Sequence, residues 1–272
     1  MTIETSTENG RQQIESAFSK AQEEQTAALM PYFTLGYPDI ETSLDIIESV
    51  AMNSNLLELG IPFSDPLADG PTVQHSTQVA LENGVTVAGC MEMVARLRQR
   101  GVKTPACFMG YYNPIMAYGL ERFVNDARAA GIQGLIVPDL PPEEATELVQ
   151  YASRAGLAYI YFLAPTSNQA RIEQVTAQAS GFIYLVSLTG VTGARRSLEG
   201  NLEPFIDRVR AHTDIPLAVG FGISTPDQAA SVGAAADGVI VGSALINAVD
   251  EASEKPAAAA AFTKSMQAAL NK

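Results

Sequence analysis

The stretch NLLELGIPFSDPLADGPTVQ, residues 55–74, begins as an apolar run and continues into a loop rich in proline, glycine and acidic residues. The run contains one charged residue, Glu58, between two leucines, and the loop adds Asp65 and Asp69. Continuous apolar runs of this length are typical of strands buried on both faces of a parallel sheet. The stretch therefore predicts a buried strand that leads into a loop carrying carboxylates.

Similar apolar or β-branched runs recur along the chain and predict strands at residues 28–33, 55–61, 105–111, 134–139, 158–164, 182–187, 215–222 and 237–243. Helical patterns lie between them, and several end in glycine, the usual helix stop. The runs start about 23 to 33 residues apart, except for a gap of about 50 after the second, where an extra helix is predicted at 72–84. Eight strand–helix units in 272 residues predict one (βα)8 TIM barrel domain. An open doubly wound sheet is the alternative.

The two ends of the chain differ in pattern. Residues 1–10 are polar and without periodicity, which predicts a frayed leader. Apolar residues at helical spacing predict an additional N-terminal helix at 13–25. The alanine-rich segment 254–262 predicts the start of a closing helix.

Composition excludes several classes of partner. A net charge of −13 and a pI near 4.6 argue against nucleic acid, because no basic cluster could neutralise its phosphates. Two cysteines, Cys90 and Cys107, are too few for a disulfide framework and favour inert core thiols in a reducing compartment. No apolar stretch is long enough to span a membrane. We therefore expect a cytoplasmic protein without membrane or nucleic-acid partners.

The residues available for catalysis are mainly carboxylates. In barrels the active site lies at the carboxyl ends of the strands. No lysine ends a strand, which disfavours Schiff-base chemistry. The two histidines, His75 and His212, lie outside strand ends, so a histidine-based metal site is not expected.

Glu58 and Asp69 are the leading candidates among the acids. Strand alternation points Glu58 into the barrel, where partial desolvation should raise its pKa toward neutrality. Asp69 lies on a long loop that could fold over the barrel mouth, although an Asp before Gly is also common turn chemistry. Asp65 and Asp139, each beside a proline, are interpreted as loop-shaping or interface residues.

Glycine-rich turns follow three strands that adjoin in a barrel. GFGIS (220–224) and VGSA (241–244) each open onto a predicted helix, whose free N–H groups would attract an anion, and GVTGA (190–194) lies beside them. Phosphate binding by backbone amides is therefore predicted, with acid–base catalysis on the phosphorylated substrate. The remaining strand ends add Tyr111 and an apolar lining suited to an aromatic body: Tyr32, Ile136, Tyr184 and Phe221.

Several segments of the sequence resemble those of one known family. The segment LELGIPFSDPLADGP (57–71) resembles the signature of the tryptophan synthase alpha subunit family. The resemblance extends in order and spacing to PYFTLGYPD (31–39), MGYYNPIMAYG (109–119), IVPDLPPEE (136–144), FLAPTS (162–167), YLVSLTGVTGAR (184–195), GFGIS (220–224) and VGSALI (241–246). It departs at Ser54-Asn55, where a Gly-Ala-Asp approach is common in the family, and at Leu188-Thr189.

The resemblance implies a lyase that cleaves indole-3-glycerol phosphate to indole and glyceraldehyde 3-phosphate in tryptophan biosynthesis, without metal or Schiff base. It implies that Glu58 protonates indole C3 and helps to remove the glycerol hydroxyl proton, while Asp69 faces the indole N–H. Tyr184 would position substrate, and Thr192 would orient Asp69. The implied phosphate-binding residues are Gly193, Gly222, Gly242 and Ser243.

The resemblance also implies a partner, a pyridoxal-phosphate beta subunit in an α2β2 tetramer, contacted around Asp65, Asn113 and Pro141. No cofactor is then expected in this chain. Two alternatives stay open from the sequence: another phosphate-binding barrel, such as an isomerase of phosphorylated sugars or aminosugars, and a catalytically silent regulatory subunit. The presence of both Glu58 and Asp69 argues against the silent subunit.

Overall fold

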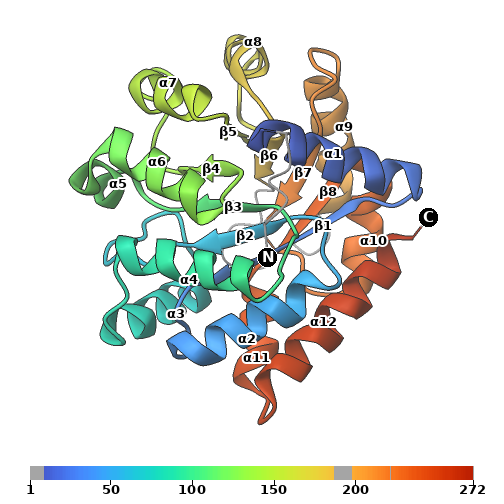
Figure 1. The fold of residues 1–272 in the computed structure, drawn as a ribbon. Helices are drawn as coiled ribbons and strands as arrows, with labels where there is room; N and C mark the ends of the chain where they lie inside the picture. The colour runs from blue at the N-terminus through green and yellow to red at the C-terminus, as the bar shows by residue number, and fades with distance from the viewer. Residues whose placement is uncertain (1–8, 187–197, 221, 272) are drawn as a thin grey trace.

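The computed structural model describes residues 9–186, 198–220 and 222–271. All eight strands pair in parallel, in chain order, and β1 pairs with β8, so the sheet closes on itself (Figure 1). The strands are β1 Ala28–Thr34, β2 Leu57–Gly60, β3 Ala106–Met109, β4 Gly134–Ile136, β5 Ala158–Leu163, β6 Ile183–Val186, β7 Leu217–Gly220 and β8 Gly238–Val241. The predicted barrel is confirmed, and the open-sheet alternative is wrong because this sheet has no edge.

Helices surround the barrel (Figure 1). They are α1 Gly10–Glu23, α2 Ile40–Ala51, α3 Pro71–Glu82, α4 Val87–Gln99, α5 Tyr112–Tyr118, α6 Leu120–Ala130, α7 Thr146–Arg154, α8 Gln169–Gln178, α9 Leu198–Arg210, α10 Pro226–Ala235, α11 Ser243–Asp250 and α12 Lys255–Leu270. The insertion after β2 is α3, as predicted, and α12 is the closing helix. Within the described ranges, no helix has the length and apolar character needed to cross a membrane.

Helix α1 packs against one end of the barrel. It begins at Gly10, three residues earlier than predicted, because Asn9 forms a capping box with Gln12. The expected frayed leader therefore cannot extend to residue 10. Ile14 and Phe18 are buried, and the Phe18 ring lies 5.6 Å from that of Phe182, which precedes β6. The apolar face of α1 thus covers the amino-terminal end of the barrel, opposite the predicted site.

Strand register sets which side chains share the barrel interior. Tyr32 of β1 is level with Glu58 of β2, and Thr34 is level with Gly60. Side chains alternate along a strand, so residues 58 and 60 face the same side. A Cβ atom at Gly60 would lie 2.2 Å from the Tyr32 hydroxyl, so only glycine allows this tyrosine to cross β2 above Glu58.

Candidate active site

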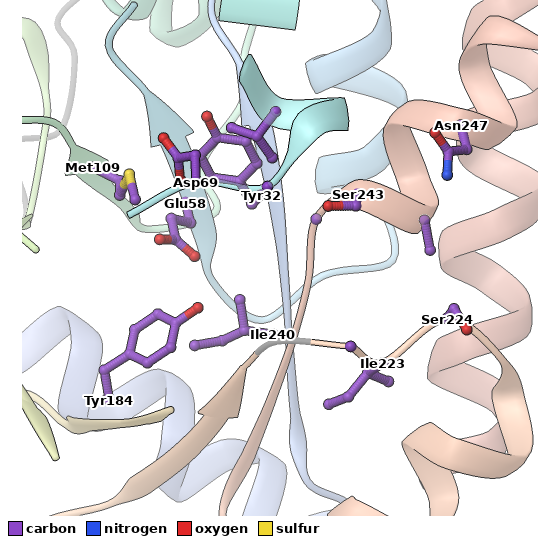
Figure 2. Close-up of a pocket in the computed structure, with 15 residues that line it drawn as sticks. Tyr32, Glu58, Asp69, Met109, Tyr184, Ile223, Ser224, Ile240, Ser243 and Asn247 are labelled. Atoms are coloured by element: carbon purple, nitrogen blue, oxygen red, sulfur yellow. The ribbon is translucent and has the colours of Figure 1, made fainter. Parts of the chain in front are cut away.

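A cavity of about 270 Å³ lies at the carboxyl ends of the strands. Figure 2 shows Glu58, Asp69 and Tyr32 gathered toward one end of it. Ser224 and Asn247 lie toward the other end, and Ser243 lies between them and Tyr32. The lining residues are Tyr32, Glu58, Asp69, Gly70, Val73, Met109, Tyr184, Gly222, Ile223, Ser224, Ile240, Gly242, Ser243, Ala244 and Asn247.

Glu58 is a buried carboxyl group without a partner for one of its oxygens. The residue is 2 % exposed, and its Oε2 atom accepts no hydrogen bond from any described residue. Burial, and to a smaller extent the nearby Asp69 charge, together raise the pKa of Glu58 to about 8. At neutral pH this side chain therefore holds a proton that it can give to a bound molecule.

Asp69 is the second acid of the cavity and lies just before α3. The Tyr111 hydroxyl donates to Asp69 Oδ2 at 3.0 Å and accepts from the Ala68 N–H at 3.0 Å. Burial raises the pKa of Asp69 to about 6, against the opposing effect of the Tyr111 hydrogen bond. Near neutral pH the pair therefore consists of an Asp69 carboxylate beside a protonated Glu58.

Tyr111 is itself held by a neighbouring loop. It precedes α5, and the first N–H group of that helix, on Tyr112, donates to Asp139 Oδ1 at 2.9 Å. The Tyr111 ring also packs on Phe63, with ring centroids 5.3 Å apart. Asp139, in the loop after β4, therefore caps α5 and helps to fix the neighbouring Tyr111, which bonds to Asp69, in agreement with the loop-shaping role expected from the sequence.

The opposite end of the cavity offers backbone N–H groups. Gly242 precedes α11, and no described side chain caps this helix. Gly222 has φ of 80°, a left-handed conformation that favours glycine. The expectation of two free helix starts is wrong for α10, because Thr225 and Gln228 form a capping box there. The α11 start is thus the one that faces the cavity with uncapped amides.

Two tyrosines cross the barrel interior in matching ways. Tyr32 lies over Gly60, and a Cβ atom at Gly220 would lie 2.2 Å from the Tyr184 hydroxyl. Each tyrosine thus crosses the next strand at a glycine two residues beyond its own level. The Tyr184 ring also packs on Phe162 with centroids 4.7 Å apart. Together they form two apolar walls of the cavity, each carrying a hydroxyl group.

Comparison with known proteins identifies the family to which the chain belongs. The family model described as "Tryptophan synthase alpha chain" matches residues 18–272. This chain belongs to the tryptophan synthase alpha chain family. It is 51% identical over 262 residues to the tryptophan synthase alpha chain of Chloroflexus aggregans, covering 95% of this chain and 98% of the relative. The Roseiflexus castenholzii alpha chain is 50% identical over 254 residues, covering 92% and 97%.

A solved structure agrees with this placement. Tryptophan synthase subunit alpha from Legionella pneumophila is 37% identical, with a TM-score of 0.88 over 95% of this chain and 98% of that chain. As a tryptophan synthase alpha chain, this protein is a lyase of tryptophan biosynthesis. The alternative of a sugar-phosphate isomerase is thereby excluded.

The structure brings together most of the residues predicted for a tryptophan synthase alpha chain. The cavity contains Glu58, Asp69, Tyr32, Tyr184, Gly222, Gly242 and Ser243. Tyr111 is outside the lining but bonds to Asp69. Ile136 is fully buried in β4 beside Met109, and it does not line the cavity. Thr192, Gly193 and Phe221 lie outside the described residues, so their roles stay predictions.

Several residues that line the cavity were not predicted from the sequence. Met109 and Ile240 share the inward strand positions of Gly60 and Gly242, so strand alternation could have identified them. Asn247 lies one helical turn after Ser243 on α11, and this spacing was also available. Val73 lies in the first turn of α3, and Ile223 and Ser224 lie in the loop after β7; how these segments approach the cavity was not evident from the sequence.

Metal and lysine chemistry find no support in the described ranges. No group of three or more His, Cys, Asp or Glu residues there could hold a metal ion. His75 and His212 are exposed, as expected, and no lysine lines the cavity. Among the described residues, the titratable groups that reach the cavity are carboxyls and phenols.

Proposed function

We propose that this cavity cleaves indole-3-glycerol phosphate to indole and glyceraldehyde 3-phosphate, with Glu58 and Asp69 as catalytic residues. The observation that supports it is the pairing of a protonated, buried Glu58 with an ionised Asp69 in one cavity. Groups whose environments separate their pKa values are suited to different roles in acid–base catalysis. Here one acid can give a proton while the other keeps a negative charge.

The proposed reaction uses these two states in turn. Glu58 gives its proton to indole C3, and the positive charge that forms on the ring is stabilised by the Asp69 carboxylate facing the indole N–H. The Glu58 carboxylate then takes the proton of the glycerol hydroxyl. The oxygen lone pair forms the aldehyde as the carbon–carbon bond breaks, and those bond electrons restore the indole ring. Glu58 ends protonated, ready for the next turnover.

The far end of the cavity is proposed to hold the phosphate. Uncapped N–H groups at the start of α11 and the left-handed turn at Gly222 suit an anion, with Ser243 as a hydroxyl donor. Amides rather than lysines would then bind it, which suits a chain of net charge −13. We propose Gly193 as a further phosphate contact. The indole contacts we propose are Tyr32, Tyr184, Thr192 and Phe221. Tyr111 would act through its hydrogen bond to Asp69, and Ile136, which does not line the cavity, is not proposed as a contact.

A beta subunit is the proposed partner, in an α2β2 assembly in the cytoplasm. Asp65, Asn113 and Pro141 are all exposed on loops or helices that follow the strands of the catalytic face. Large apolar side chains lie in the same segments, with Leu67 93% and Met116 53% exposed. Exposed apolar side chains on adjacent loops favour a protein interface. We propose that pyridoxal phosphate belongs to the partner and that this chain binds no cofactor.

The test compares wild type with Glu58→Gln and follows indole release with and without a tryptophan synthase beta subunit. Wild type should release indole and gain rate with the partner. Glu58→Gln should lose turnover by about a factor of 100 or more, because it cannot exchange the proton, while still binding glycerol phosphate. The matched control is Glu92→Gln, an exposed glutamate on α4. A wild type that only activates the partner would identify a silent regulatory subunit.

A further inference from the structure

Three buried hydroxyl groups form a chain that ends at the cavity. Tyr32 Oη lies 3.2 Å from Thr34 Oγ1, and Thr34 Oγ1 lies 2.7 Å from Ser76 Oγ. Ser76 Oγ in turn lies 2.9 Å from the Val73 carbonyl oxygen, within α3. The chain thus connects the end of β1 to the helix that follows Asp69.

The carbonyl at the end of this chain fixes the direction of every proton in it. A carbonyl oxygen only accepts, so Ser76 donates its single hydroxyl proton to Val73. Ser76 must then accept from Thr34, and Thr34, having used its proton, must accept from Tyr32. The Tyr32 proton is therefore directed to Thr34 and away from the cavity.

Asp69 consequently has two nearby phenols with opposite roles. Tyr111 donates its proton to the Asp69 carboxylate. Burial and, after it, the Asp69 charge raise the pKa of the Tyr32 hydroxyl, and Figure 2 shows both side chains at the same end of the cavity. Because its proton is directed to Thr34, Tyr32 presents only oxygen lone pairs to the space beside Asp69.

We propose that Thr34 and Ser76 are positioning residues that withhold the Tyr32 proton from Asp69, so that a carboxylate oxygen stays free for a hydrogen-bond donor of the substrate. The identity of that donor, an indole N–H, rests on the proposed function. The direction of the chain does not. Without this arrangement the Tyr32 proton would be free to compete with the substrate for the Asp69 carboxylate.

The variant Thr34→Val removes the acceptor of the Tyr32 proton at nearly constant side-chain shape. We expect the buried phenol then to turn to the Asp69 carboxylate, whose charge already acts on it, since an unpaired buried donor is costly. A second hydrogen bond to the charged form should lower the pKa of Asp69 by roughly one unit. Adding Tyr32→Phe removes that proton, so the double variant should return toward the wild-type value.

The experiment is a pH titration of the ligand-free protein, followed by NMR of ¹³C-labelled aspartate carboxyl groups, with Asp69 assigned by Asp69→Asn. Among the described residues, the other titratable groups whose electrostatics couple to Asp69 are Glu58, Tyr32, Tyr111 and Tyr184, so each variant is titrated over the full range that includes Glu58. Thr34→Ser keeps a hydroxyl and should restore the wild-type value. Thr263→Val, which removes a buried hydroxyl on α12, is the matched control.

An unshifted Asp69 in Thr34→Val, or a shift that persists in the Tyr32→Phe/Thr34→Val double variant, would overturn the proposal. Indole release by the same proteins separates this proposal from the proposed function. If the NMR shifts occur as expected but wild type makes no indole with a beta subunit present, the hydroxyl chain stands and the assigned reaction is wrong. If wild type makes indole but the pKa of Asp69 is unchanged in Thr34→Val, the role proposed for the hydroxyl chain is wrong and the assigned reaction stands.

Discussion

At the scale of single residues, the two cavity carboxyls predict a bell-shaped dependence of rate on pH. Below about pH 6 Asp69 becomes protonated and loses the charge that stabilises the indole cation. Above about pH 8 Glu58 loses the proton that it gives to C3. Turnover of wild type, measured from pH 5 to about 9, should therefore fall on both sides, with apparent values that belong to the coupled pair. A rate that rises steadily through pH 9 would contradict the role given to Glu58.

Tyr111→Phe is expected to move the acid side of this profile upward. The phenol stabilises the charged form of Asp69, so its removal raises the pKa of that carboxyl. It also leaves the Ala68 N–H without its acceptor, which should loosen the loop. We expect roughly a tenfold loss in kcat/KM at pH 6.5 and a smaller loss at pH 7.5. An equal loss at both pH values would show that Tyr111 acts only on loop position.

Some of these residue roles could be predicted from the sequence and others could not. Glu58 was predictable because a lone charge in an apolar strand must point into the barrel. The bond from Tyr111 to Asp69 was not, since it joins two segments 42 positions apart through side chains on loops. The hydroxyl chain of Tyr32 depends on three rotamers at once. Strand alternation predicts which face a residue occupies, but it does not predict its hydrogen-bond partner.

At the scale of elements, two arginines on α4 differ sharply in what they stabilise. Arg98 is mostly buried. It donates hydrogen bonds to the carbonyls of Gly131, Val102 and Thr104 and to the Gln133 side chain. These bonds connect the loop before β3 with the loop before β4. Arg100 forms exposed ion pairs with acids of α2. Burial of Arg98 lowers its pKa to about 10, still well above neutral.

Arg98→Ala should therefore lower the free energy of unfolding by about 3 kcal/mol, because three part-buried carbonyl groups lose their donor. Arg100→Ala, two positions away, should cost less than about 1 kcal/mol, and salt should reduce even that. Urea unfolding of both variants at low and high salt measures the difference. Equal losses would show that the buried carbonyls find other donors.

Element boundaries were less predictable than element types. Helix α1 starts before its first apolar residue because Asn9 and Gln12 cap each other, a signal that is present in the sequence but weak. Helix α5 has too few turns to show a periodic pattern and is stabilised from outside by Asp139. The capping box of α10 satisfies N–H groups at the start of that helix, whereas the start of α11 has no side-chain cap. Contacts with neighbouring loops, absent from local periodicity, determine these details.

At the scale of the whole molecule, stability and catalysis are concentrated at opposite ends of the barrel. Phe18 and Ile14 of α1 pack at the amino-terminal end, whereas the cavity lies at the carboxyl ends of the strands. Phe18→Ala should lower the free energy of unfolding by about 3 to 5 kcal/mol, as expected for a buried aromatic ring. The KM for substrate should change little at 25 °C. Thermal unfolding and steady-state kinetics on one preparation test both parts, and a large rise in KM would show that the two ends are coupled.

The crossing of Tyr32 over Gly60 and of Tyr184 over Gly220 has a consequence for substrate range. Because each phenol lies directly on the backbone of its glycine, the tyrosine fills the strip of the barrel interior above that strand. Shortening the neighbouring aliphatic residues would leave that strip filled. An enzyme redesigned to accept bulky ring-substituted indoles would have to shorten a tyrosine and retain its glycine, so that the vacated strip of backbone becomes the new floor for the substituent.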